Sequence, residues 1–350
     1  MESIGTRSLA QRGLSMGCMG LGCAQLGGLY QPMAEEEARA IVDTAWSLGI
    51  RYFDTAPYYG YTLSERRLGA ALRDRARDDY VVSTKVGRLM VPDDTVQPGD
   101  SGWAAPLPFR PQFDYTHDGI LRSHEGSLQR LGLDRIDILY VHDIGRVTHG
   151  ARHAHYWHQL TEGGGFRALL RLRDEGAVRA IGLGVNEWEV VADALDVCDI
   201  DCALLAGRYT LLEQGALALL DHCAARGVGI VIGGPFNSGI LAGVRKFDYA
   251  DAPDAVIARA DALAAACRDF DVPLPAAALQ FPMAHPAVVS CIPGAQNPEQ
   301  LRQNAAWFAA PIPADVWQAL ARDGLIDPHA PLPSSSCHML GSGVVTRTQP

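Results

Sequence analysis

The sequence lacks the features that would place the protein on nucleic acid or in a membrane. It has no cluster of Lys and Arg, and its formal net charge is -10 at pH 7, whereas polyanionic partners are held mainly by clustered cations. No apolar run approaches the roughly 18 residues that a membrane helix needs, and the first residues, MESIGTRSLAQRG, lack the apolar core of a secretory signal. We therefore expect a cytoplasmic protein that binds neither nucleic acid nor membrane.

Cysteine pairs at the spacing of disulfide or metal motifs are also missing. No CxxC occurs among the eight cysteines, most of which lie inside apolar runs such as CALLAG (202–207) and VVSCIP (288–293). This placement is typical of small buried side chains in a reducing compartment. Cys198 and Cys202 could be metal ligands, but no second pair lies near them, so core packing is the better interpretation.

The glycine motif of a dinucleotide-binding open sheet, GxGxxG after an early strand, is absent as well. The segment GLGCAQLGG (20–28) has its glycines at other spacings, which disfavours a doubly wound open sheet. With 350 residues, 48% of them hydrophobic, the chain could form two ordinary domains. It could equally form a single α/β barrel, which takes about 250 residues.

What the sequence does contain is a regular alternation of short apolar runs and amphipathic segments. The apolar runs predict strands at 14–22, 50–54, 80–85, 136–142, 178–184, 202–207, 228–234 and 288–293. Residues at helical spacing predict helices at 35–49, 64–74, 118–132, 166–176, 189–197, 215–227, 253–270 and 298–308. Strands that are apolar on both faces and alternate with helices are typical of a parallel sheet. The repeated unit predicts a closed (β/α)8 TIM barrel.

Long polar insertions follow the third and fourth predicted strands, at about 88–117 and 143–165. Loops after strands lie on the catalytic face of such a barrel. The second insertion contains HGARHAHYWH (149–158), which we interpret as a flexible lid rather than a metal site. We expect one barrel domain over 1–326 and a mobile Pro/Ser-rich tail over 327–350.

Polar side chains stand where three neighbouring strands are predicted to end. Asp54 ends the second strand, Lys85 the third and His142 the fourth, and the tyrosines of YFDTAPYYGYTLSE (52–65) follow Asp54 directly. A phenol has a reference pKa of about 10, so it needs a nearby cation to act as an acid or base at neutral pH. Lys85 is the candidate cation, and Asp54 would keep it charged inside the barrel. Each residue also has a structural interpretation, as a buried ion pair, a core histidine or a packed aromatic residue.

The segments FDTAPYYG (53–60), STKVG (83–87) and DRIDILYVHD (134–143) resemble the aldo-keto reductase superfamily. These are (β/α)8 barrels that move hydride between nicotinamide cofactors and carbonyl or hydroxyl carbons, and the resemblance spans residues 14–310. It implies that Tyr59, five positions after Asp54, is the catalytic tyrosine. It also implies that Asp54, Tyr59, Lys85 and His142 form the catalytic tetrad, and it assigns no role to Tyr61.

Further segments resemble a group of bacterial sugar dehydrogenases with pyridoxal-oxidising relatives. They are LGGLY (26–30), STKVGRLM (83–90), GRYTLLEQ (207–214), IGGPFNSGIL (232–241) and ALQFPMAHPAVVSCIPGA (278–295). This resemblance implies oxidation of the anomeric hydroxyl of an aldose, such as L-fucose or D-arabinose, to the lactone. Alternatives that stay open are oxidation of pyridoxal, NADPH-dependent reduction of aldehydes, and a cofactor-binding regulatory subunit.

The resemblance also implies where the cofactor and substrate bind. The implied cofactor contacts are Asn186, Phe236, Asn237, Ser238, Gly239, Gly294, Gln300 and Asn304. Basic residues that hold the 2′-phosphate of NADP elsewhere in the family are replaced here by Gly294 and Gln300, and only Arg302 lies nearby, so we expect NAD. The aromatic residues Tyr30, Tyr58, Trp103 and Trp157 are candidates for packing on a sugar face or a pyridine ring.

Overall fold

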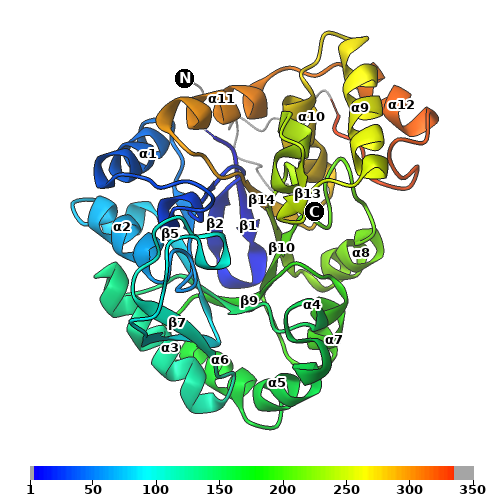
Figure 1. Ribbon diagram of the computed structural model, residues 1–350. Coiled ribbons are helices and arrows are strands. Elements are labelled where there is room, and N and C mark those ends of the chain that lie inside the picture. The colour runs from blue at the N-terminus through cyan, green and yellow to red at the C-terminus, as the bar shows by residue number, and fades with distance from the viewer. Residues whose placement is uncertain (1–3, 335–350) are drawn as a thin grey trace.

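Parallel strands form a barrel at the centre of the computed structural model, which describes residues 4–334 (Figure 1). The sheet has eight strands in the order β14-β11-β10-β9-β8-β5-β4-β3. They are β3 (Leu21–Gly22), β4 (Tyr52–Asp54), β5 (Val81–Val86), β8 (Ile138–His142), β9 (Ala180–Val185), β10 (Cys202–Ala206), β11 (Gly229–Gly233) and β14 (Val288–Ile292). Backbone hydrogen bonds from Gly20 N to Cys291 O (3.0 Å) and from Gly22 N to Pro293 O (3.2 Å) join the first strand to the last. The predicted (β/α)8 barrel is therefore confirmed.

Helices surround the strands, as Figure 1 shows. They are α1 (Glu35–Ser47), α2 (Leu63–Leu72), α3 (His117–Leu131), α6 (Gly165–Asp174), α7 (Glu189–Val197), α8 (Leu217–Arg226), α9 (Asp254–Arg268), α10 (Leu274–Gln280), α11 (Pro298–Ala309) and α12 (Ala314–Arg322). Every residue of β5, β8 and β9 is buried, because helices cover the outer face of these strands and side chains fill the barrel. This explains why the strands read as continuous apolar runs.

The predicted first strand, 14–22, is wrong in detail because it contains separate elements. β1 (Thr6–Leu9) pairs antiparallel with β2 (Leu14–Gly17), and only β3 belongs to the barrel. Leu14 and Met16 are buried while Ser15 is exposed, which is the alternation of a strand with one buried face. The hairpin packs with residues at the starts of barrel strands, such as Tyr52 and Ile138. It therefore closes the amino-terminal end of the barrel and leaves the other end open for a site.

The insertion after β5 is folded as an antiparallel hairpin of β6 (Arg88–Pro92) and β7 (Phe109–Phe113), joined by a segment that includes η4 (Asp100–Gly102). The insertion after β8 forms α4 (Arg146–His149), η5 (Gly150–Arg152) and α5 (His153–Leu160). The expectation of a flexible lid over 149–158 is wrong, because this segment is helical and buries His149, His153 and Tyr156. Within residues 4–334, no group of His, Cys, Asp and Glu side chains is arranged to hold a metal ion.

A hairpin that the sequence did not predict follows β11 and η6 (Asn237–Ala242). Its strands are β12 (Lys246–Phe247) and β13 (Ala250–Asp251), and its turn residues Asp248 and Tyr249 have φ angles of 46° and 65°. In Figure 1 the label of β13 lies inside the ring of helices, over the barrel.

The described cysteines are buried, as expected, and none of them is in a disulfide within residues 4–334; Cys337 lies outside the described residues. No helix within 4–334 is long and apolar enough to cross a membrane. Ala330 is buried and Leu332 packs on the core, so the packed chain extends beyond residue 326. The remainder of the predicted tail, 335–350, lies outside the described residues.

Candidate active site

A buried ion pair links the ends of β4 and β5. Lys85 Nζ donates to Asp54 Oδ2 at 2.7 Å and to the Thr55 carbonyl oxygen at 2.9 Å. The other carboxylate oxygen, Asp54 Oδ1, accepts from Ser83 Oγ at 2.7 Å. Asp54 and Lys85 are each only 2% exposed. Parallel pairing of Asp54 with Ser83 brings these groups together, since the carboxyl ends of neighbouring strands meet at one edge.

Electrostatic effects keep Lys85 protonated. Burial by itself would lower the pKa of its ammonium, but the Asp54 carboxylate and the Tyr59 phenol together raise it above its ordinary value. Burial also raises the pKa of Asp54, and the nearby ammonium and the Ser83 hydroxyl oppose that shift. Because the ion pair is short and both carboxylate oxygens accept hydrogen bonds, the charged forms of Asp54 and Lys85 stabilise each other.

Tyr59 lies beside Lys85 at the mouth of the barrel. Lys85 Nζ is 4.8 Å from the centroid of the Tyr59 ring, so its charge acts on the phenol. The side chain is partly exposed, yet burial among protein groups raises the pKa of the phenol, and the attraction of Lys85 lowers it by less. The expectation that Lys85 brings the phenol toward its ionised form is therefore only partly met: the effect has the expected sign, but burial outweighs it.

Glycine residues fix the position of the loop that carries Tyr59. Gly60 has a φ of 62°, and a Cβ there would overlap the carbonyl oxygen of Gly27. A Cβ on Gly27 would in turn lie 2.6 Å from the carbonyl carbon of Tyr59. The loops after β3 and β4 thus approach closely through backbone alone, which only glycine allows.

His142 ends β8 and faces the tyrosines. Its ring centroid is 6.1 Å from those of Tyr58 and Tyr59, and 5% of the residue is exposed. Burial lowers the pKa of the imidazole well below its ordinary value, and the positive charges of Arg88 and Lys85 lower it further. His142 is therefore neutral at pH 7 and can donate a hydrogen bond without adding a charge.

Aromatic side chains line one side of this group. The buried Trp103 ring lies 5.7 Å from Tyr58 and 5.8 Å from Tyr59, centroid to centroid. Its indole Nε1 is buried and has no hydrogen-bond partner in the described structure. Tyr61, which had no role in the sequence interpretation, hydrogen-bonds Ser101 Oγ at 3.0 Å. It thereby supports the loop that carries Trp103.

Comparison with known protein families gives a match over most of the chain. The model of the aldo/keto reductase family matches residues 18–322. The chain belongs to the aldo/keto reductase family.

Relatives within the family include a pyridoxal 4-dehydrogenase from Microbacterium luteolum, 51% identical and aligned over 91% of this chain and 97% of the relative. A D-threo-aldose 1-dehydrogenase from Pseudomonas sp is 43% identical over the same shares of both chains. Among solved structures, aldo-keto reductase AKR11C1 from Bacillus halodurans (holo form) superimposes with a TM-score of 0.69 at 26% identity, covering 92% of this chain and 96% of that one.

Aldo/keto reductases use nicotinamide cofactors, and the expected cofactor residues of this member lie on neighbouring strand ends. One group, Phe236 to Gly239, follows β11, and the other, Gly294 to Asn304, follows β14. These strands pair, and Phe236 packs edge-on against Trp307 of α11 with ring centroids 6.4 Å apart. The two groups therefore adjoin one face of the molecule.

The individual side chains fit a cofactor to different degrees. Asn304 is 1% exposed; its Nδ2 donates to Gly294 O at 3.1 Å, while its Oδ1 is buried without a hydrogen-bond partner in the described chain. An acceptor without a donor is what an adenine amino group would satisfy. The side chain of Asn237 instead accepts from Thr210 (2.6 Å) and donates to the Gly207 carbonyl oxygen (3.0 Å), so its amide is already used within the protein.

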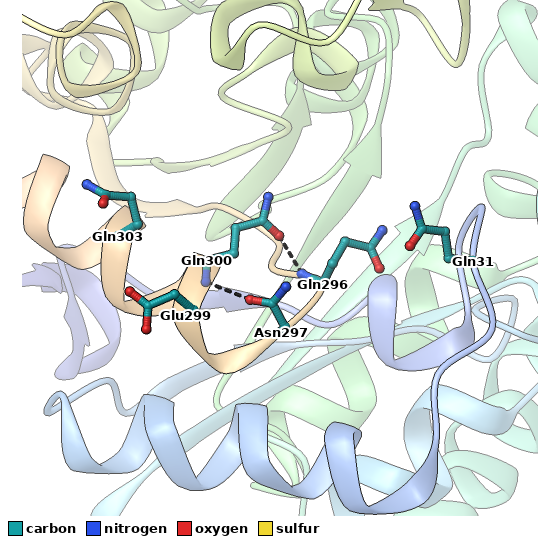
Figure 2. Close-up of a pocket in the computed structure, with 6 residues that line it drawn as sticks. All are labelled: Gln31, Gln296, Asn297, Glu299, Gln300 and Gln303. Atoms are coloured by element: carbon teal, nitrogen blue, oxygen red, sulfur yellow. Dashed lines mark hydrogen bonds between the residues drawn. The ribbon is translucent and has the colours of Figure 1, made fainter.

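A cavity of about 540 Å³ adjoins the start of α11 (Figure 2). Its lining consists of Gln31, Gln296, Asn297, Glu299, Gln300 and Gln303. Asn297 Oδ1 accepts from Gln300 N at 2.8 Å and Gln300 Oε1 accepts from Gln296 N at 2.6 Å. The cavity contains amides and one carboxylate but no Lys or Arg, and none of its lining residues belongs to the tetrad.

Two sequence-based substrate candidates lie apart from each other. Tyr30 is 49% exposed and its backbone N donates to Gly102 O at 2.9 Å, which places it beside the Trp103 loop. Trp157 packs on α5 against His153 and Phe166, and the structure brings it into contact with none of the tetrad residues.

Sequence reasoning missed residues that the structure places beside the tetrad. Tyr249, at the tip of the β12–β13 hairpin, donates its hydroxyl to Asn186 Oδ1 at 3.5 Å. The residue is 59% exposed, but its phenol lies in the electrostatic field of Tyr59 and Asp143, and burial of that end raises its pKa. Arg88 and Asp143 were also missed, although Asp143 directly follows His142 in the motif LYVHD.

Proposed function

We propose that the protein oxidises a cyclic hemiacetal to a lactone, with NAD as hydride acceptor. The observation that supports the proposal is the close contact of Asp54, Lys85, Tyr59 and His142 at the carboxyl ends of the strands. A proton-transfer phenol, a cation beside it and a neutral imidazole donor are the groups that removal of a hydroxyl proton requires.

In this mechanism Tyr59 acts as the base. The phenolate takes the proton of the hemiacetal hydroxyl as the carbon–oxygen double bond forms, while the hydrogen on the same carbon leaves as hydride. A bound oxidised nicotinamide supplies the hydride acceptor. Lys85 stabilises the phenolate, Asp54 keeps Lys85 charged, and neutral His142 donates a hydrogen bond to the substrate oxygen. The proton thus passes to Tyr59, and the two electrons leave the carbon with the hydride.

The proposed substrate class follows from the aromatic wall. The Trp103 ring offers a flat face beside Tyr59, and its unpartnered Nε1 offers a donor for a hydroxyl or ring oxygen. Pyridoxal closes to a cyclic hemiacetal between its aldehyde and hydroxymethyl groups, and aldoses do so between their aldehyde and a chain hydroxyl. The 51% identity to a pyridoxal 4-dehydrogenase favours pyridoxal as the first substrate to test. The D-threo-aldose class, including L-fucose and D-arabinose, is the second.

The choice of NAD over NADP rests on the cavity beside α11. A 2′-phosphate carries nearly two negative charges and needs basic partners when it is desolvated. The lining contains Glu299 and amides, and the nearby Arg302 already pairs with Glu299 at 3.3 Å. Comparable kcat/KM values for NAD and NADP would contradict this assignment.

The test is a panel of pyridoxal, L-fucose and D-arabinose with NAD and with NADP, followed by the absorbance of the reduced cofactor. Tyr59→Phe should lower kcat by about two to four orders of magnitude and leave NAD binding intact. Tyr80→Phe is the matched control, because Tyr80 precedes β5 and lies at the opposite end of the barrel. Activity confined to aldehyde reduction with NADPH, or cofactor binding without turnover of any of these substrates, would refute the proposal.

A further inference from the structure

Asp143 occupies an unusual backbone conformation directly after the catalytic histidine. Its φ is 45°, in the left-handed region that residues other than glycine seldom adopt, and its backbone N donates to Gly184 O at 2.9 Å. Such conformations persist where the surroundings over-determine them, and they cluster at functional sites. Here the conformation turns the carboxylate back toward the tetrad.

The Asp143 carboxylate contacts charged and polar groups from three different strand ends. Oδ2 pairs with Arg88 Nη2 and lies 3.4 Å from His142 Nε2. Oδ1 accepts from Asn186 Nδ2 at 3.3 Å. The side chain is 14% exposed, so these contacts form in a largely dry environment where they count for more than at the surface.

Arg88 acts as the counter-ion of this carboxylate. Its side chain is 6% exposed, and the guanidinium lies 4.3 Å from the centroid of Tyr58 and 5.4 Å from that of Phe113. A guanidinium held between aromatic faces has little freedom to follow a moving partner. The Arg88–Asp143 pair is therefore a fixed support beside the substrate tyrosine and the catalytic histidine.

The contact with His142 determines which ring nitrogen carries the proton. Nε2 lies beside the carboxylate, whereas Nδ1 is buried without a hydrogen-bond partner in the described residues. Burying an N–H group without an acceptor costs more free energy than burying an unprotonated ring nitrogen without a donor. A nearby carboxylate also attracts an N–H, which favours the proton on the nitrogen beside it. The neutral imidazole is accordingly protonated on Nε2, and because the 3.4 Å contact with Asp143 is longer than an ordinary hydrogen bond, this N–H can still donate to a substrate oxygen.

The contact with Asn186 orients the other side of the site. Because Nδ2 points to Asp143, Oδ1 of the same amide points outward, where Tyr249 approaches it at 3.5 Å. Arg208 Nε holds the Asn186 carbonyl oxygen at 2.6 Å. Arg208 fixes only the backbone of Asn186, so the side-chain amide is oriented by Asp143 on its nitrogen and by Tyr249 on its oxygen. Oδ1 has a second lone pair and can still accept from a carboxamide such as that of nicotinamide.

We propose that Asp143 is a positioning residue that holds His142 in its Nε2-protonated form and orients Asn186 toward the nicotinamide carboxamide. The inference rests on the proposed function in taking Asn186 as the nicotinamide contact. Asp143 touches neither substrate nor cofactor in this role; it acts through its two neighbours, and Arg88 keeps it charged and in place.

Two measurements without turnover test the role. In Asp143→Asn, the Kd for NAD should rise about tenfold, as expected for one weakened hydrogen bond, while the Kd for ADP-ribose, which lacks nicotinamide, stays unchanged. The ¹⁵N spectrum of His142, identified by its loss in His142→Gln, should change from the Nε2-protonated form to a mixture of tautomers. With a substrate that the wild type oxidises, kcat should fall about 100-fold with a much smaller change in KM.

Asp93→Asn is the matched control, since Asp93 pairs with Arg110 at 2.6 Å on the neighbouring β6–β7 hairpin and contacts neither His142 nor Asn186. If Asp143→Asn does not fold, the double variant Arg88→Met, Asp143→Asn removes both buried charges and is measured in the same way. An equal loss of affinity for NAD and ADP-ribose, or an unchanged His142 tautomer, would overturn the inference. Failure of the wild type to oxidise any hemiacetal would instead count against the proposed function, because the two binding and spectroscopic measurements need no turnover.

Discussion

Replacing Asp54 by Asn removes one charge from the buried pair while keeping the shape of the side chain. Lys85 would then keep its hydrogen bond to the Thr55 carbonyl oxygen (2.9 Å) but lose the only carboxylate that it contacts among the described residues. Because both partners are 2% exposed, water cannot replace the lost charge. Removing one member of a buried ion pair costs about 3–5 kcal/mol, and we expect Asp54→Asn to lower the free energy of unfolding by that amount.

Lys85→Met makes the complementary change. The Asp54 carboxylate would keep the Ser83 hydroxyl at 2.7 Å but no cation, so a similar loss of about 3–5 kcal/mol is expected. The double variant Asp54→Asn, Lys85→Met leaves no unpaired charge. Its loss should be about that of one single variant rather than the sum, which gives a coupling energy of about 3–5 kcal/mol.

The assay is urea unfolding of the cofactor-free protein at pH 7, followed by tryptophan fluorescence. The same set of variants separates catalysis from stability: all three should lose at least about 100-fold in kcat, although the double variant should be no less stable than either single variant. The exposed pair Lys246–Asp251, with Asp251 91% exposed, is the matched control, and its coupling should stay below about 1 kcal/mol. Additive losses at Asp54 and Lys85 would refute the reasoning.

Further predictions concern the loops and the pH dependence. Gly60→Ala should lower the free energy of unfolding by about 1–3 kcal/mol, because its Cβ would overlap Gly27 O; unchanged urea unfolding would contradict the close approach. Tyr249→Phe removes only the 3.5 Å contact with Asn186 and should change the Kd for NAD by less than about fivefold. Tyr249→Ala also removes the ring and should raise the substrate KM more than Tyr249→Phe does. Identical effects of the two variants would show that the ring has no role. Since burial raises the pKa of Tyr59, kcat/KM for oxidation should rise steadily from pH ~7 to pH ~10, and a plateau near neutral pH would show a lowered pKa instead.

The arrangement of the tetrad was predictable because it follows from topology. Parallel strands place their carboxyl ends at one edge of a barrel, so assigning Asp54, Lys85 and His142 to three consecutive strand ends already implied that they meet. The apolar runs identified those strands, because strands that are buried on both faces consist almost entirely of apolar residues. Topology did not indicate which tyrosine lies beside these three residues. The family resemblance selected Tyr59, and the structure places Tyr59 rather than Tyr61 against Lys85.

The features that were missed have no periodic signal. The strands β12 and β13 have two residues each, too short for alternation to show, so nothing marked Tyr249 as a residue over the barrel mouth. Asp143 adopts a left-handed φ without being glycine, and that conformation is imposed by contacts distant in sequence. For Trp157 the sequence suggested a role that the structure does not support. An aromatic residue could have lined the substrate site, but the position of α5 directs Trp157 against Phe166 instead.

Two opposing effects set the protonation state of Tyr59. A lysine near a phenol favours the phenolate, and the contact exists, but the dry surroundings that make Lys85 and Asp54 depend on each other also penalise an ionised phenol. The resting site therefore holds a protonated Tyr59 beside a charged Lys85, which is the form needed to donate a proton in carbonyl reduction. Oxidation must first remove that proton. The positive charge of an oxidised nicotinamide, when bound, would lower the pKa of the phenol as Lys85 does, so we expect Tyr59 to become a base chiefly in the cofactor complex.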